Sequence, residues 1–338
     1  ENYYDLARAE DFERLFGGLK IGQNPPPLHN RYFILKLNFS VVDPSGDHDT
    51  IRSALFDHVN TRIEDTSVRY VRWLGQPARI YPDNAIASLQ SLLGAVSRTP
   101  YKLYLLIDEY DNFANEVMIS PLRGTDRYEA LVRGEGTIKT LFKAIKEGAE
   151  GRGIDRVFIT GVSPVVLSDI TSGYNVAEDL SFEQDYHDLC GFTESELRAA
   201  LEAVAVAHRL GADQADTALN LMRDFYNGYR FSPPQEERLY NPTLSLYFLK
   251  HLARHGIYPA RLLDDNLAMD RNRIQYVARL PHGEALVNGA LNPAEPLTVA
   301  QLANRFGVQE MLAAPRDPAF LVSLLYYFGV LTLAGRNE

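Results

Sequence analysis

Three short apolar runs, separated by helical segments, constrain the fold more than any other feature of this sequence. The runs are typical of β-strands and occupy residues 32–40, 104–107 and 156–160. Between them, aliphatic residues recur every three or four positions, which predicts helices over residues 51–63, 85–96 and 136–149. Strands that alternate with helices in this order predict an α/β fold with a parallel sheet and helical crossovers.

The pattern becomes helical after about residue 185. Thr193 and Glu196 have the spacing of a capping box and predict a helix that ends near Leu210. A second helix is predicted over residues 214–226, and Asn241-Pro242 is a typical start for a third, which ends near residue 255. Residues 1–185 are therefore predicted to form the α/β core and residues 186–258 a small helical domain.

The remaining residues, 259–338, have a third pattern. A short helix over residues 297–307 ends at a glycine, and a helix over 320–328 is followed by a strand over 330–333. Helix, helix and strand at this spacing predict a winged-helix-like region. Its charged side chains sum to zero between residues 296 and 338, which does not favour a DNA-reading face.

Composition excludes several classes of protein. The 338 residues carry 34 Lys+Arg against 44 Asp+Glu, and this net charge of −10 argues against non-specific nucleic-acid coating or an anionic membrane as partner. The single cysteine, Cys190, excludes a disulfide scaffold and a cysteine-based zinc site and suggests a reducing, cytoplasmic location. The longest uncharged stretch, residues 319–335, is too short for a membrane span.

Asp108 and Glu109 follow directly on the apolar run that ends at Ile107. An apolar strand that ends in Asp-Glu is the Walker B pattern of nucleotide hydrolases, since ligands bind at the carboxyl ends of strands in such sheets. In this interpretation Asp108 holds Mg²⁺ through water and Glu109 activates the attacking water. The alternative is a buried strand followed by a charged loop.

The next strand also ends in polar residues. Thr160 and Ser163 are candidates for sensing the γ-phosphate of a bound nucleotide, and the alternative is a hydroxyl that only serves the turn. His251 and His255 are four residues apart but lack the glutamate of a zinc-protease motif, so a surface pair is expected. His187 and Cys190 are close in sequence, which does not by itself indicate a nucleophile and its base.

One part of a nucleotide site is missing from these residues. A phosphate-binding loop has the pattern G-x-x-x-x-G-K-[ST], and the 338 residues contain no Gly-Lys pair. Lys139-Thr140 matches the last two positions of this pattern, but it lies inside a predicted amphipathic helix and is therefore rejected as a phosphate-binding loop.

Together with other segments of the sequence, these motifs make the chain resemble the bacterial AAA-ATPase-like family. The segments that carry the resemblance lie in this order along the chain: residues 12–22, 30–33, 105–113, 157–164, 225–231, 240–242 and 324–333. The resemblance implies a P-loop ATPase core with bound ATP and Mg²⁺, a helical lid and a winged-helix-like region. It also implies a Walker A segment and a central strand before Glu1, and a nuclease-like domain after the core in many members.

The resemblance gives Arg230 a role as a lid arginine that contacts phosphate, while the alternative is an arginine that caps a helix and packs its turn. The function expected is an Mg-ATP-dependent ATPase coupled to a partner protein or nuclease-like domain. The alternative is a nucleotide-binding regulatory module with little or no hydrolysis. A chain without the phosphate-binding loop is expected to bind ATP poorly, and the oligomeric state stays open.

Overall fold

The computed structural model describes residues 1–43, 45–111, 136–162, 176–209, 211–263, 278, 282–290, 297–303 and 318–335. The chain divides into two compact units. The first comprises Glu1–Val176 with Ala303–Pro315, and the second comprises Ala177–Leu302 with Arg316–Glu338.

The first unit is built on a parallel sheet with the strand order β1-β2-β3. The strands are β1 (Tyr32–Asn38), β2 (Lys102–Asp108) and β3 (Ile154–Ile159). In the register of the first pair, Asn38 lies opposite Asp108, and in the second pair Ile107 lies opposite Ile159. The predicted α/β fold with a parallel sheet is therefore confirmed.

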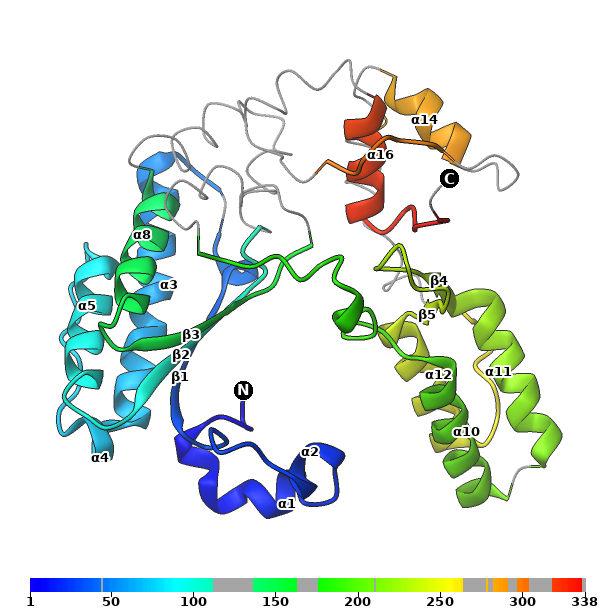
Figure 1. Ribbon diagram of the computed structural model, residues 1–338, viewed down its shortest axis with the longest axis horizontal. Helices are drawn as coiled ribbons and strands as arrows, with labels where there is room; N and C mark the ends of the chain where they lie inside the picture. Colours follow the sequence, from blue (N-terminus) through cyan, green and yellow to red (C-terminus); the bar gives the residue numbers. More distant parts are fainter. Residues whose placement is uncertain are drawn as a thin grey trace. The chain divides into compact units, whose positions relative to one another are not determined.

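Three long helices gather on one face of this sheet (Figure 1): α3 (His48–Arg69), α5 (Ala85–Val96) and α8 (Thr137–Ala149). Alternate residues of β2 are buried on that side, namely Leu103, Leu105 and Ile107. The residues between them are only half-buried, and Phe158 of β3 is 40% exposed. The second face is therefore the more open one. Two short elements, η2 (Phe39–Val41) and α4 (Val71–Leu74), complete the crossover after β1.

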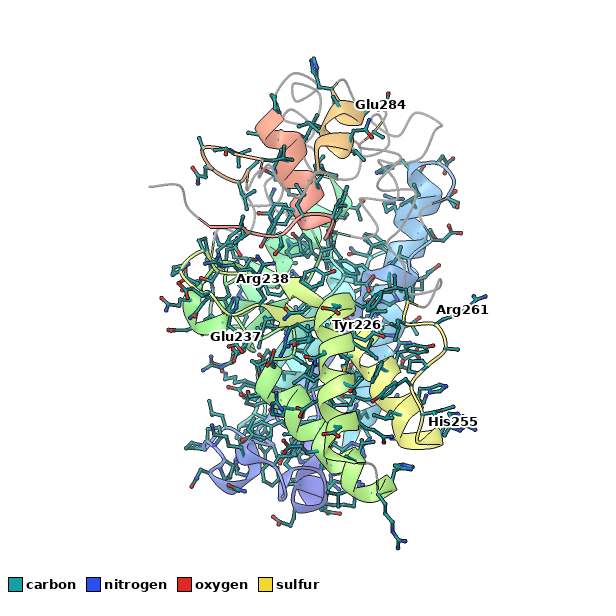
Figure 2. All side chains as sticks on the ribbon, turned by 90° about the vertical axis from the view of Figure 1, so that its right-hand side faces the viewer. Tyr226, Glu237, Arg238, His255, Arg261 and Glu284 are labelled. Atoms are coloured by element: carbon teal, nitrogen blue, oxygen red, sulfur yellow. The ribbon has the colours of Figure 1, made fainter. Side chains whose placement is uncertain are left out.

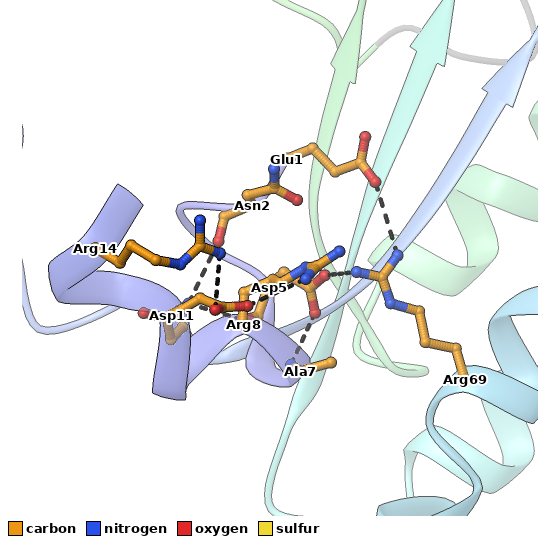
Figure 3. Close-up of polar contacts among 9 residues, drawn as sticks. Glu1, Asn2, Asp5, Ala7, Arg8, Asp11, Arg14 and Arg69 are labelled. Atoms are coloured by element: carbon orange, nitrogen blue, oxygen red, sulfur yellow. Dashed lines mark hydrogen bonds and ion pairs between the residues drawn. The ribbon is translucent and has the colours of Figure 1, made fainter. Parts of the chain in front are cut away.

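The N-terminal segment is anchored to the start of β1 by a buried carboxylate. Asp5 is fully buried and accepts a hydrogen bond from the Tyr70 hydroxyl at 2.7 Å. Figure 3 shows its other two contacts, a hydrogen bond from the Ala7 N–H at 2.8 Å and the pair with Arg69. The Tyr70 hydroxyl in turn accepts the Ile34 N–H of β1 at 3.1 Å. After this anchor the chain forms the short helices η1 (Leu6–Asp11), α1 (Phe12–Phe16) and α2 (Lys20–Gln23).

The second unit contains a three-helix group, α10 (Glu194–His208), α11 (Ala212–Tyr226) and α12 (Pro242–His255). The predicted capping box and the Asn241 cap are both present. Tyr226, labelled in Figure 2, is buried and donates a 2.6 Å hydrogen bond to the Leu262 carbonyl. The buried residues of this group form a core of their own: Leu197, Leu201, Ala218, Leu219, Met222, Tyr226, Tyr240, Phe248 and Leu252.

Shorter elements complete the second unit. They are η3 (Gln184–Tyr186), an antiparallel pair of β4 (Asn227–Tyr229) and β5 (Leu239–Tyr240), and the helices α14 (Gly283–Ala290) and α16 (Pro318–Tyr327).

Two predictions for the C-terminal residues are wrong where the structure describes them. Residues 297–303 are not helical, and 330–333 form no strand. An extended segment becomes a strand only when its backbone pairs with another strand. Here the contact is made by a side chain, because the Thr332 hydroxyl accepts the Arg230 N–H at 2.8 Å. The helix predicted over residues 320–328 is confirmed as α16. The winged-helix-like region and the three domain boundaries stay predictions.

Candidate functional site

The carboxyl ends of the three parallel strands bring polar residues to one edge of the sheet. β1 ends at Asn38, β2 ends at Asp108, and Thr160 follows β3 directly. In-register parallel pairing places these ends side by side, because every strand runs in the same direction. This is the edge at which open α/β sheets bind their ligands.

Asp108 has a different partner on each carboxylate oxygen. The Thr160 hydroxyl donates a 2.7 Å hydrogen bond to Oδ1, and the Lys36 ammonium lies 3.5 Å from Oδ2. The side chain of Asp108 is 37% exposed, so a solute can reach it. The structure therefore brings together two residues that the sequence singled out separately, Asp108 and Thr160.

Glu109 takes up an unusual backbone conformation at the same edge. Its φ angle is 51°, in the left-handed region that non-glycine residues adopt rarely and that recurs at functional sites. The half-buried Glu109 carboxylate makes no hydrogen bond or ion pair with the part of the chain that the structure describes. As far as these residues go, its oxygens are open to a ligand or to a water molecule.

The turns that follow β2 and β3 are fastened to each other. Asp111 is fully buried and accepts the Val162 N–H at 3.0 Å. Gly161 packs so closely that a Cβ there would lie 2.4 Å from the Tyr110 ring and 2.5 Å from the Asp111 carboxylate. Only glycine fits this position without a shift of its neighbours, so the approach keeps Thr160 next to Asp108.

These oxygen donors suit a magnesium ion that is held mainly by water and phosphate. Asp108 offers one accessible carboxylate and Thr160 a hydroxyl next to it, and both are ligand types that Mg²⁺ prefers. No group of three or more His, Cys, Asp or Glu residues that could hold a metal occurs within the described ranges. The donor set therefore fits Mg²⁺ with few protein ligands and does not indicate an all-protein metal cage.

The sequence predicts two further phosphate contacts, Ser163 and Arg230. Ser163 is outside the described residues. Arg230 belongs to the second unit, where its guanidinium donates to the carbonyls of Pro233 at 2.8 Å and Ala334 at 3.0 Å. These contacts tie the end of the β4 segment to the chain after α16.

Two of the candidate histidines, His187 and His251, bind backbone groups. His187 is buried, with Nδ1 accepting the Ser232 N–H at 3.3 Å and Nε2 2.9 Å from the Glu237 carbonyl. Both of its ring nitrogens are occupied, so it is not placed as a base for the exposed Cys190. The rings of His251 and His255 lie 4.8 Å apart at the end of α12 (Figure 2 labels His255).

Sequence reasoning missed three residues of the edge. Lys36, Asp111 and Gly161 all contact the candidate residues or hold them in place. Lys36 left a local signal, because a lysine interrupts an otherwise apolar strand. Asp111 and Gly161 lie in segments that carry the family resemblance, but their contacts depend on the tertiary structure. None of the helices in the described ranges is long and apolar enough to cross a membrane.

The first half of the chain matches a known family model. The family model described as "Predicted AAA-ATPase" matches residues 1–171. A protein of Azotobacter chroococcum mcd 1, described as an uncharacterized protein in the vnfD 5' region, is 27% identical over 150 residues, which are 44% of this chain and 25% of that protein. The chain thus spans about a quarter of that relative's length. No solved structure matches the chain.

Proposed function

Because the chain belongs to the predicted AAA-ATPase family, we propose that it contains the Walker B half of an Mg-ATP-dependent ATPase site. The observation that carries this proposal is the 2.7 Å hydrogen bond between Thr160 and Asp108, beside the Glu109 carboxylate, which has no partner among the described residues. In enzymes that transfer a phosphoryl group to water, carboxylates at this edge of a parallel sheet hold the metal ion and position the attacking water.

Each residue has a role in this proposal. Asp108 holds Mg²⁺ through water, and the ion supplies charge neutralisation for the phosphate oxygens when it is bound. Glu109 orients the attacking water and accepts its proton. Thr160 or Ser163 senses the γ-phosphate.

We assign the helical lid to the second unit. In the full-length protein, we propose that nucleotide state is coupled to a partner protein or to a nuclease-like domain. Support for a lid comes from the separate buried core of α10, α11 and α12, which lets this group behave as a body of its own. Arg230 is proposed to reach phosphate only after it releases the carbonyls of Pro233 and Ala334. The winged-helix-like assignment of residues 259–338 belongs to the same proposal.

The test is ATP turnover by the full-length protein and its Glu109→Gln variant. Loss of the base is expected to lower kcat by about a hundredfold or more while ATP binding is kept. Glu64→Gln is the matched control, because Glu64 is an exposed glutamate in the middle of α3.

Unchanged turnover in Glu109→Gln would contradict the assignment of Glu109. If the wild-type protein binds ATP and changes conformation without measurable turnover, the regulatory module replaces the ATPase as the function. If it does not respond to nucleotide at all, both proposals fail.

A further inference from the structure

Lys36 is an anomaly in β1. The strand is buried along most of its length, and Lys36 is its one exposed residue. Lysine is disfavoured in strands, and its neighbours Leu35 and Leu37 are both buried. Neither the fold of the sheet nor the proposed roles of Asp108, Glu109 and Thr160 require a cation at this position.

The position of the Lys36 ammonium is defined by Asp108. Its Nζ lies 3.5 Å from Oδ2, the oxygen that Thr160 does not bind. Within the described ranges, Asp108 is the acidic partner of Lys36, and the two side chains are 46% and 37% exposed. Ion pairs this exposed contribute little to folding stability, so stability does not account for the lysine.

An ammonium at this place occupies the space that a metal ion, or the water that links it to Asp108, would take beside the carboxylate. With Oδ1 engaged by the Thr160 hydroxyl, Oδ2 is the oxygen open to a cation, and Lys36 already supplies a positive charge there. Two cations within a few ångströms repel each other, and each lowers the affinity of the carboxylate for the other.

We propose that Lys36 is the resident cation of Asp108 in the metal-free protein and that Mg²⁺ must displace its ammonium before it can bind. The inference rests on the proposed function, in which Asp108 is the magnesium aspartate. Lys36 is therefore a positioning residue. It holds the carboxylate of Asp108 in place without metal and raises the concentration of divalent ion that the site needs.

The experiment measures metal binding without nucleotide. Mn²⁺ is titrated into the nucleotide-free, full-length protein, and free Mn²⁺ is followed by electron paramagnetic resonance. Lys36→Met removes the charge and keeps the length of the side chain, so Mn²⁺ is expected to bind about tenfold more tightly, the size expected for removing one nearby unit charge. Lys36→Arg keeps the charge and is expected to bind like wild type.

Lys102→Met is the matched control. It changes the net charge equally, and Lys102 is an exposed residue at the opposite end of β2 from Asp108. Lys36→Met binding Mn²⁺ no more tightly than Lys102→Met would overturn the inference, provided that both variants keep the wild-type unfolding midpoint.

Asp108→Asn separates this inference from the proposed function. If Asp108→Asn abolishes Mn²⁺ binding while Lys36→Met leaves it unchanged, Lys36 is a bystander and the metal assignment stands. If Asp108→Asn binds Mn²⁺ as well as wild type does, the magnesium site itself is misplaced and the inference about Lys36 is overturned with it.

Discussion

The Thr160 hydroxyl donates a 2.7 Å hydrogen bond to Asp108 Oδ1, although 52 residues separate the two in the chain. Parallel pairing of β2 and β3 places them next to each other, and the close packing of Gly161 on Tyr110 and Asp111 supports that position. The bond orients the carboxylate so that its second oxygen faces away from β3 and toward Lys36.

Thr160→Val should weaken ATP turnover while leaving the fold intact. Valine keeps the shape of threonine but cannot donate to Asp108, so the carboxylate loses its fixed orientation. We expect a decrease in kcat of about tenfold, equivalent to one hydrogen bond of about 1.4 kcal/mol. Thr160→Ser keeps the donor and should retain most activity. Equal activity in the valine and serine variants would show that the bond is not used.

Asp5→Ala should be strongly destabilising. The substitution takes the acceptor from the buried Tyr70 hydroxyl and from the Ala7 N–H and leaves Arg69 without its buried partner. We expect the free energy of unfolding to fall by about 2–4 kcal/mol in urea or guanidinium titrations.

Glu1→Ala is the control for that substitution. Glu1 also pairs with Arg69, but at 3.8 Å and with its side chain 40% exposed, so the cost should be below about 0.5 kcal/mol. Similar losses in the two variants would mean that the charge on Arg69, and not the buried network, carries the stability.

The stability of the first unit should fall as the pH drops below neutral because of His58. Burial, and to a lesser extent the nearby Arg62, lowers the pKa of His58 below its usual value of 6.5. The unfolded chain therefore binds a proton at a higher pH than the folded protein does. Stability is fully present above pH 6.5 and is lost as the pH falls from there toward the folded-state pKa.

Unfolding titrations between pH 7.5 and 5.0 measure this loss. His58→Leu removes the titrating group and should flatten the dependence. His48→Gln, at a histidine of the same helix whose side chain is 39% exposed, should leave the dependence as in wild type. If His58→Leu keeps the full pH dependence, another group is responsible for it.

Much of the local structure could be predicted because its causes are local. Apolar spacing located α5 at Ala85–Val96, the capping box located the start of α10, and Asn241-Pro242 located the start of α12. Strand and helix preferences depend on neighbours within a few residues, so a single sequence carries them. The strand expected over residues 330–333 failed because a strand needs a partner from elsewhere in the chain.

The candidate site also has a part that is local in the sequence and a part that depends on the tertiary structure. By itself the sequence determined that an apolar strand ends in Asp108-Glu109 and that another ends at Thr160, since both are runs of consecutive residues. Only the tertiary structure decided that Thr160 binds one oxygen of Asp108, that Lys36 approaches the other, and that Asp111 fastens the two turns together. Those contacts join three strands, and they depend on strand order and register, which follow from how the helices and the sheet pack as a whole.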